Sequence, residues 1–286
     1  GVSDGIRLGG YCGFRVVRVR AAGPRSRANR RLFVSGVVCW FSCGAASAVA
    51  THLALQEHPD AVIAYQDTGA EHPDSARFMA DCEKWYGRKI LTLKSHRFND
   101  VWEVWEKRRY IVGVSGAPCT GEMKRRVAED YLFKVLGYGT REVIGYTAEE
   151  SKRVRDFEAN NPERKLWPIL AERGLSKADC FKVLADAGIE LPEMYKLGYR
   201  NNNCIGCPKG QSGYWNKIRV DFPDVFDRMA KLERSVGAAI NKTEPTVNGV
   251  RQRIPVYLDE LDPRAGRYKA EASISCGLFC PTENQP

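Results

Sequence analysis

The chain has 286 residues, of which 43% are hydrophobic, and its formal net charge is +9. This length suffices for one substantial α/β core, or for such a core with a small appendage. No apolar run approaches the roughly 18 residues that a membrane-spanning helix needs, and the first residues lack the charged-then-apolar layout of a secretory signal. We therefore expect a cytoplasmic protein without a membrane partner.

Positive charge is concentrated in residues 1–31, where eight arginines face a single acid, Asp4. This segment thus carries +7 of the total charge, and the rest of the chain is nearly neutral. Such an arm can contact nucleic-acid phosphates. It can equally be a flexible extension or a cloning remnant, so the basic balance by itself does not identify a nucleic-acid partner.

Beyond the arm, strand-like and helix-like patterns alternate. Apolar β-type runs at 33–41, 61–67 and 89–94 are separated by helical patterns at 48–58 and 72–87. This βαβαβ order is typical of a parallel sheet that is covered by helices. We therefore expect a doubly covered α/β fold.

The second half of the chain contains further helices and one more strand. The expected segments are a helix at 121–137, a strand at 141–147, a polar stretch at 148–165, and helices at 176–189 and 222–240. Ser176 is a suitable N-cap for the helix at 176–189, and Gly188 is a suitable stop. The chain becomes loop-like after Pro192, and the tail from Asn241 onward is irregular.

A turn of small residues joins the first strand to the first helix. It consists of Ser42, Cys43, Gly44, Ala45, Ala46 and Ser47. Small side chains let the backbone approach an anion, whose charge is then stabilised by backbone N–H groups, the helix dipole and two serine hydroxyls. The spacing differs from the Walker and dinucleotide-binding patterns. The turn is therefore either a phosphate cradle or an ordinary tight turn.

The second strand ends in a polar sequence as well. Asp67, Thr68 and Gly69 follow it directly, and ligands of parallel sheets bind where strands end at their carboxyl edge. An aspartate at this place can accept hydrogen bonds from ribose or adenine groups, or help to hold Mg²⁺. The alternative is a polar turn that caps the helix starting near His72.

Ten cysteines in a chain without a signal segment are not expected to form a disulfide framework. Five of them fall in loop-like sequence: Cys119, Cys204, Cys207, Cys276 and Cys280. The Cys-x-x-Cys pair at 204 and 207 can chelate one metal centre, either zinc or an iron–sulfur cluster. Cys119 and one of the last two cysteines can complete a set of four.

Other cysteines and tryptophans fit packing roles. Cys39 lies on the first strand, and Cys82 and Cys180 lie on helical patterns, where a thiol acts as a small hydrophobe. Trp102 and Trp105 are expected in the core. By contrast, the basic residues that follow Cys119 can either neutralise pyrophosphate oxygens or form a solvated helix face; they are Lys124, Arg125 and Arg126.

Two of these motifs together resemble the PP-loop motifs of the ATP pyrophosphatase and phosphoadenosine-phosphosulfate (PAPS) reductase superfamily. They are the turn at 42–47 and the Asp67-Thr68-Gly69 element with Pro73 and Asp74. Cys43 replaces the first glycine of the motif. The resemblance covers roughly residues 32–280 and is strongest to stand-alone PAPS-reductase-like proteins of DNA phosphorothioation or phage type. It implies a twisted parallel sheet with helices on both faces, of the adenine nucleotide alpha hydrolase-like kind.

The resemblance also implies a domain organisation and a ligand set. Residues 32–190 would form the nucleotide-binding domain, and 191–286 a cysteine-bearing extension on the same core. ATP with Mg²⁺ would bind at the turn 42–47, at Asp67, Thr68 and Gly69, and at Lys124 and Arg153. A 4Fe–4S cluster, or zinc as the alternative, would be held by Cys119, Cys204, Cys207 and Cys280.

The implied reaction is adenylation of an acceptor for sulfur insertion, with Ser47 and Asp67 as central residues. The acceptor would be a nucleic acid, DNA or tRNA, and a cysteine desulfurase could donate sulfur. The oligomeric state stays open, a homodimer being one option. Two alternatives remain. The first is a sulfonucleotide reductase with Cys276 as the nucleophile, although the Glu and His that flank the family's cysteine are missing here. The second is a zinc-stapled nucleic-acid-binding subunit without enzymatic activity.

Overall fold

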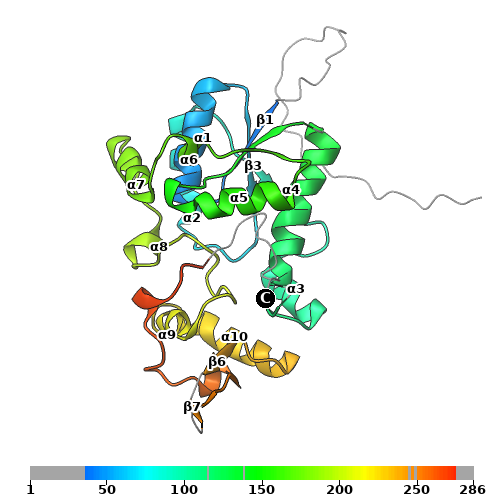
Figure 1. Ribbon diagram of the computed structural model, residues 1–286, viewed down its shortest axis with the longest axis vertical. Helices are drawn as coiled ribbons and strands as arrows, with labels where there is room; N and C mark the ends of the chain where they lie inside the picture. Colours follow the sequence, from blue (N-terminus) through cyan, green and yellow to red (C-terminus); the bar gives the residue numbers. More distant parts are fainter. Residues whose placement is uncertain (1–35, 115, 138, 244–245, 248–249, 275–286) are drawn as a thin grey trace, which may run out of the picture. The chain divides into compact units, whose positions relative to one another are not determined.

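A five-stranded parallel sheet forms the centre of the structure (Figure 1). The computed structural model describes residues 36–114, 116–137, 139–243, 246–247 and 250–274. The strands of the central sheet are β1 (Val37–Trp40), β2 (Val62–Gln66), β3 (Leu91–Leu93), β4 (Arg141–Val143) and β5 (Lys165–Trp167). They lie in the order β3-β2-β1-β4-β5, with every neighbouring pair parallel. The order reverses at β1, so the loops after β1 and its neighbours meet at a switch point where such sheets bind ligands.

Helices cover both faces of this sheet. The α-helices are α1 (Ala45–Glu57), α2 (Ser75–Tyr86), α3 (Val101–Arg108), α4 (Arg126–Tyr131), α5 (Ser151–Asn160), α6 (Ile169–Glu172), α7 (Lys177–Asp186), α8 (Glu193–Lys196), α9 (Ser212–Asp221) and α10 (Pro223–Val236). Two π-helical segments, η1 (Thr120–Arg125) and η2 (Leu132–Leu136), flank α4. Short 3₁₀ turns are η3 (Ala148–Glu150), η4 (Leu258–Glu260) and η5 (Tyr268–Ala270).

The alternation of side chains along the strands separates two apolar layers. Cys39 and Ile63 face the layer that contains α1, α2, α6 and α7. Val38 and Ala64 point to the other side, where α4, η2 and Phe157 of α5 pack. The predicted α/β fold with a parallel sheet and helices on both faces is therefore confirmed.

A third apolar cluster lies around α3, α9 and α10. Trp105 and Trp215 are among its fully buried side chains, and Trp102 is 5% exposed, so the predicted core role of Trp102 and Trp105 is confirmed. Two short antiparallel hairpins accompany this part, and they consist of β6 (Asn241–Thr243) with β9 (Ile254–Val256) and β7 (Thr246–Val247) with β8 (Val250–Arg251).

Several elements differ from the sequence-based expectation. The polar stretch 148–165 contains η3 and α5 and leads into β5, and α3 and α9 were not predicted. In α5 the apolar signal is weak, because Phe157 is the residue that the helix buries. The helix expected at 121–137 is present, but its backbone changes between π and α geometry.

A buried ion pair fixes the β4–β5 edge. Arg164 donates to both carboxylate oxygens of Glu142, and Trp40 Nε1 donates to Glu142 Oε2 over 2.7 Å. The side chains of Arg164 and Glu142 are 1% and 0% exposed. Because a charge buried without its partner is costly, this pair specifies how β5 follows β4.

Candidate active site

The loop between β1 and α1 is closed by its own serines. Ser47 Oγ accepts from the N–H of Ser42 over 3.1 Å, lies 3.0 Å from Ser42 Oγ, and donates to the Gly44 carbonyl over 2.9 Å. α1 begins at Ala45 directly after an extended Gly44. The N-terminal end of a 13-residue helix therefore lies in the loop, and its positive dipole end favours an anion there.

Cys43 contributes backbone conformation to this loop rather than thiol chemistry. Its φ is 55°, a left-handed conformation in which glycine is favoured, and this explains why the family motif has glycine there. The Cys43 side chain is fully buried. Burial raises the pKa of its thiol far above the usual value. Burial therefore disfavours the thiolate form of Cys43.

Gly145, two residues beyond the end of β4, packs directly against the loop. A Cβ at this position would lie 2.7 Å from the backbone nitrogen of Ser47 and 2.8 Å from the carbonyl carbon of Ala46. Non-bonded contacts of a Cβ atom are essentially never shorter than 3.0 Å, so only glycine fits at this position. The sequence analysis did not single out Gly145, because this contact joins segments about one hundred residues apart in the chain.

Asp67 lies at the end of β2, as predicted, and is held by two partners. Its Oδ1 accepts from the N–H of Gly69 over 2.9 Å, and its Oδ2 lies 2.9 Å from Lys94 Nζ. Gly69 has a φ of 68°, and a Cβ there would lie 2.7 Å from Asp100 Cβ. Lys94, which follows β3, was missed by the sequence analysis, because its contact with Asp67 joins two different strand ends.

Three of the predicted metal ligands line one small cavity. Its volume is about 20 Å³, and its walls include Cys119, Cys204, Cys207, Thr68 and Lys124. Cys119 directly precedes η1, and π-helical segments occur frequently at functional sites. Cys276 and Cys280 lie outside the described residues.

The polar segment that follows β2 contacts this cavity directly. The Thr68 hydroxyl, whose residue is fully buried, donates to Glu71 Oε1 over 2.6 Å and lies 3.0 Å from Cys204 Sγ. Glu71 was not among the predicted site residues. The Asp67-Thr68-Gly69 element and the Cys-x-x-Cys loop are therefore parts of one site.

The donor set of the cavity fits a soft metal centre. Thiolates select zinc or iron–sulfur clusters over Mg²⁺. Two buried donors of the cavity wall, Trp105 Nε1 and Thr120 Oγ1, make no hydrogen bond within the described part of the chain, so they can donate to an acceptor in the cavity. Among the described residues no three His, Cys, Asp or Glu side chains are arranged to hold a single metal ion. The three cysteines share the cavity lining without forming a closed ligand set, so a metal centre would need them to move closer together and would need a further ligand.

The cysteine loop is attached to the phosphate loop by hydrogen bonds. Asn202 Nδ2 donates to the Cys43 carbonyl over 2.8 Å and to Ser75 Oγ over 3.0 Å. Tyr195 of α8 accepts from the N–H of Ala45 over 3.3 Å. These hydrogen bonds fix the position of the 201–207 loop relative to the turn at 42–47.

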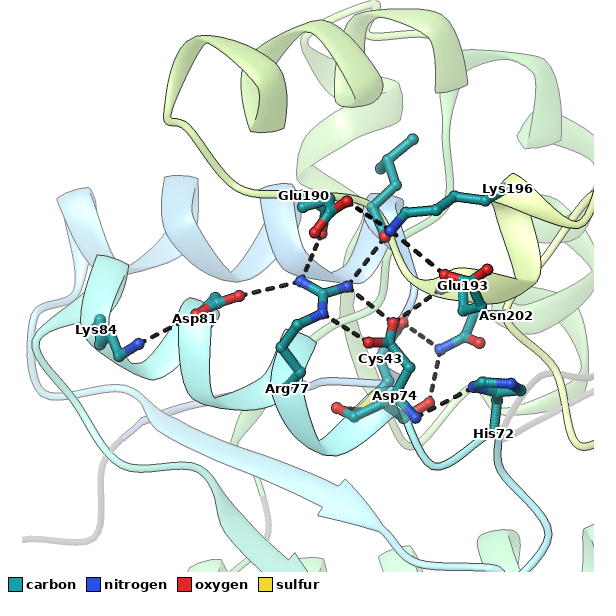
Figure 2. A network of polar contacts seen from close by, with 12 residues as sticks. Cys43, His72, Asp74, Arg77, Asp81, Lys84, Glu190, Glu193, Lys196 and Asn202 are labelled. Atoms are coloured by element: carbon teal, nitrogen blue, oxygen red, sulfur yellow. Dashed lines mark hydrogen bonds and ion pairs between the residues drawn. The ribbon is translucent and has the colours of Figure 1, made fainter.

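Figure 2 shows how α8 is held in place next to this loop. Arg77 of α2 bonds to Asp74 and Asp81 and donates to the carbonyls of residues 190 and 191 just before α8. The N–H of Glu193 donates to Asp74 Oδ2 over 2.9 Å. The hydrogen bonds from Arg77 hold the pKa of Asp74 below its usual value. α2 therefore anchors the segment that carries Tyr195.

Lys124 and Arg153 differ in their surroundings. Lys124 lines the cysteine cavity, and its charge acts on Cys43, so it lies between the two halves of the site. Arg153 projects from α5, pairs with Glu150 and lies over the Tyr146 ring, with its guanidinium carbon 4.7 Å from the ring centre. Lys124 thus has the more central place of the two.

Residues 36–210 match the family model of the phosphoadenosine phosphosulfate reductase domain, which is well over half of the chain. The chain belongs to this family. The predicted membership of the PAPS reductase superfamily is thereby confirmed, and the parallel α/β sheet agrees with it.

Two proteins of Methanocaldococcus jannaschii whose function is uncharacterised are similar to this family member. MJ0973 is 25% identical over 207 residues, which are 69% of this chain and 47% of the relative. MJ0066 is 24% identical over 217 residues, which are 73% of this chain and 43% of the relative. The chain therefore spans less than half the length of these relatives. Within the described residues, no helix is long and apolar enough to cross a membrane.

Proposed function

We propose that the protein is a PP-loop ATP pyrophosphatase that adenylates an acceptor for sulfur insertion into nucleic acid. One observation carries the proposal: the self-closed Ser42–Ser47 loop at the N-terminus of α1 adjoins the cavity lined by Cys119, Cys204 and Cys207. An anion site beside sulfur-bearing side chains is suited to reactions that couple nucleotide cleavage to sulfur chemistry.

In the proposed reaction, loop amides and the helix dipole bind the triphosphate of ATP. An acceptor oxygen attacks the α-phosphorus, so a new P–O bond forms while the bond to pyrophosphate breaks. Lys94, which pairs with Asp67, and Lys124, which lines the cysteine cavity, would stabilise the charge that develops on the leaving group. Asp67 would help to hold Mg²⁺, which supplies further charge stabilisation when bound. The terminal sulfur of a persulfide on the proposed donor, a cysteine desulfurase, then attacks the adenylated acceptor and AMP leaves. A second thiol cleaves the resulting disulfide and releases the thiolated acceptor, so a thiol reductant completes the cycle.

The cavity cysteines have a separate proposed role. Cys119, Cys204 and Cys207, together with Cys280, would hold a 4Fe–4S cluster, with zinc as the alternative. Support comes from the shared cavity and from the two wall donors, Trp105 Nε1 and Thr120 Oγ1. Cys276 then remains for thiol chemistry.

Sulfonucleotide reduction is the second candidate, and the description of the matched family favours it. In that reaction a thiolate attacks the sulfur of PAPS and forms a thiosulfonate. The required nucleophile would be Cys276, because the described Cys43, Cys39, Cys82 and Cys180 are buried thiols whose pKa values are raised by burial.

Calorimetric binding of ATP and of PAPS to anaerobically purified protein separates these two functions, with iron and zinc counted in the same sample. We expect ATP to bind more tightly than PAPS and iron to be present. We expect Ser47→Ala and Asp67→Asn each to lower ATP affinity and pyrophosphate release by at least about tenfold.

Ser235→Ala and Asp186→Asn are matched controls, because both side chains are on exposed parts of helices outside the site. They should leave ATP binding unchanged. Preference for PAPS would replace the proposal with the reductase, and normal turnover in both site variants would remove the nucleotide-site assignment.

A further inference from the structure

One carboxylate outside the loop region is surrounded by arginines. Glu122 of η1 is nearly buried, with a side chain 7% exposed, and it pairs with Arg97 over 3.1 Å, with Arg126 over 3.5 Å and with Arg108. Three guanidinium groups therefore share one negative charge. Their side chains remain 43–53% exposed, so each can present N–H donors to solvent while its other side is fixed by Glu122.

These arginines border an open groove of about 500 Å³. Its lining includes Arg108, Arg125 and Arg126, and its acids are Glu122 and Glu129. With Arg97 the surroundings hold four guanidinium groups against two carboxylates. Burial raises the pKa of Glu129.

Two Lys-Arg-Arg runs supply most of this charge. One comprises residues 107–109 at the end of α3, and the other comprises residues 124–126 at the end of η1. The bond from Arg108 to Glu122 brings the ends of the two runs together. The basic surface is therefore formed by several elements. It is not the single solvated helix face that was the alternative interpretation of Lys124, Arg125 and Arg126.

We infer that this groove binds the sugar–phosphate backbone of the acceptor nucleic acid. Planar guanidinium groups held in fixed orientations suit phosphate oxygens, and an open groove lets a polymer pass through. The inference rests on the proposed function for the chemistry at the neighbouring site, but the binding itself is a separate property.

The position of the groove relative to the cysteine cavity supports this assignment. Pro118 lines the groove while Cys119 lines the cavity, and Arg125 lines the groove while Lys124 lines the cavity. One short segment therefore has the two sites on its two sides. The groove and the cysteine cavity are therefore neighbours that share this segment as a wall.

The test uses the full chain and labelled single-stranded DNA, duplex DNA and RNA, with binding followed by fluorescence anisotropy between about 50 and 200 mM salt. Arg108→Ala/Arg126→Ala should weaken binding at low salt about tenfold and reduce the slope of log affinity against log salt by about two. Comparison of the three affinities shows whether the groove prefers DNA or RNA, and whether it prefers single-stranded or duplex DNA.

Lys84→Ala/Lys182→Ala is the matched control, since it removes the same charge at exposed positions on α2 and α7 and leaves the basic arm in place. It should bind like wild type. Arg108→Lys/Arg126→Lys keeps the charge and should retain most of the affinity, which excludes misfolding as the cause of a loss.

The inference is overturned if no probe binds, if the control loses as much affinity as the groove variant, or if the groove variant loses ATP binding instead. Failure of the proposed function has a different signature, because wild type would then bind the oligonucleotide through the groove but would not bind ATP.

Discussion

At the scale of single residues, Gly145 has no room for a side chain because backbone atoms of the neighbouring loop lie against it. Gly145→Ala would push a methyl group into the backbone of Ala46 and Ser47, neither of which can move without opening the start of α1. We expect a loss of stability of about 1–3 kcal/mol and a loss of ATP affinity. Calorimetry and denaturant unfolding measure both. Gly36→Ala, where the added methyl group meets nothing within 4 Å, should change neither.

Single residues also show what the sequence could reveal about the site. The roles of Cys39, Cys82 and Cys180 as buried thiols followed from their places on apolar strand and helix patterns, and burial raises the pKa of each to about 12. Lys94 and Glu71 could not be assigned in this way. Their significance depends on neighbouring strands and loops that fold next to them, and a one-dimensional pattern does not contain that information.

At the scale of elements, Glu233 ties α10 to the chain that follows it. This fully buried carboxylate accepts the N–H groups of Ile240 and Leu258. Burial nevertheless raises its pKa to about 7. Between about pH 4.5 and pH 7 the unfolded chain loses this proton while the folded chain keeps it, so the contribution of Glu233 to stability falls as the pH rises.

The matching experiment compares urea unfolding of wild type and Glu233→Gln at several pH values. The stability of wild type relative to the variant should fall by about 3 kcal/mol from pH 4.5 to pH 7, because Gln does not titrate. Glu57→Gln, at an exposed position on α1, reports on the general effect of this substitution. A difference between wild type and Glu233→Gln that is independent of pH would contradict the assignment.

Elements whose apolar residues recur with a clear helical or strand periodicity could be predicted from the sequence. Elements in which this periodicity is weak could not. The helix at Lys177–Asp186 was recognisable from its period and from Ser176, whose hydroxyl caps it by accepting from the N–H of Asp179. In contrast, β5 has three residues and depends on the buried Arg164–Glu142 pair next to it. Such a pair forms only when β4 is already in place, so local sequence did not indicate the strand.

At the scale of the whole molecule, the cysteine cavity joins distant parts of the chain. Cys119 precedes η1, while Cys204 and Cys207 lie between α8 and α9. If these thiols share a metal centre, that centre cross-links the sheet domain to the later helices. We expect Cys204→Ser to lose bound iron or zinc and to melt at a lower temperature, because metal binding energy contributes to folding.

Cys180→Ser is the matched control for that experiment. Cys180 is buried on α7 and does not line the cavity, so this variant can lose stability but should keep its metal. Elemental analysis together with thermal melting distinguishes the two effects. Full metal content in Cys204→Ser would show that the cavity does not hold the centre.

The hydrogen bond between Ala45 and Tyr195 has a consequence for selectivity. The first amide of α1 is already paired with a phenolic oxygen, so an arriving anion exchanges one acceptor for another at this position. A small anion that reaches few other donors gains little from such an exchange. If the proposed nucleotide binds at this turn, its polyphosphate chain would also reach the serine hydroxyls and the lysines, and its gain would be correspondingly larger. We therefore expect this hydrogen bond to weaken the binding of inorganic phosphate more than the binding of a nucleotide.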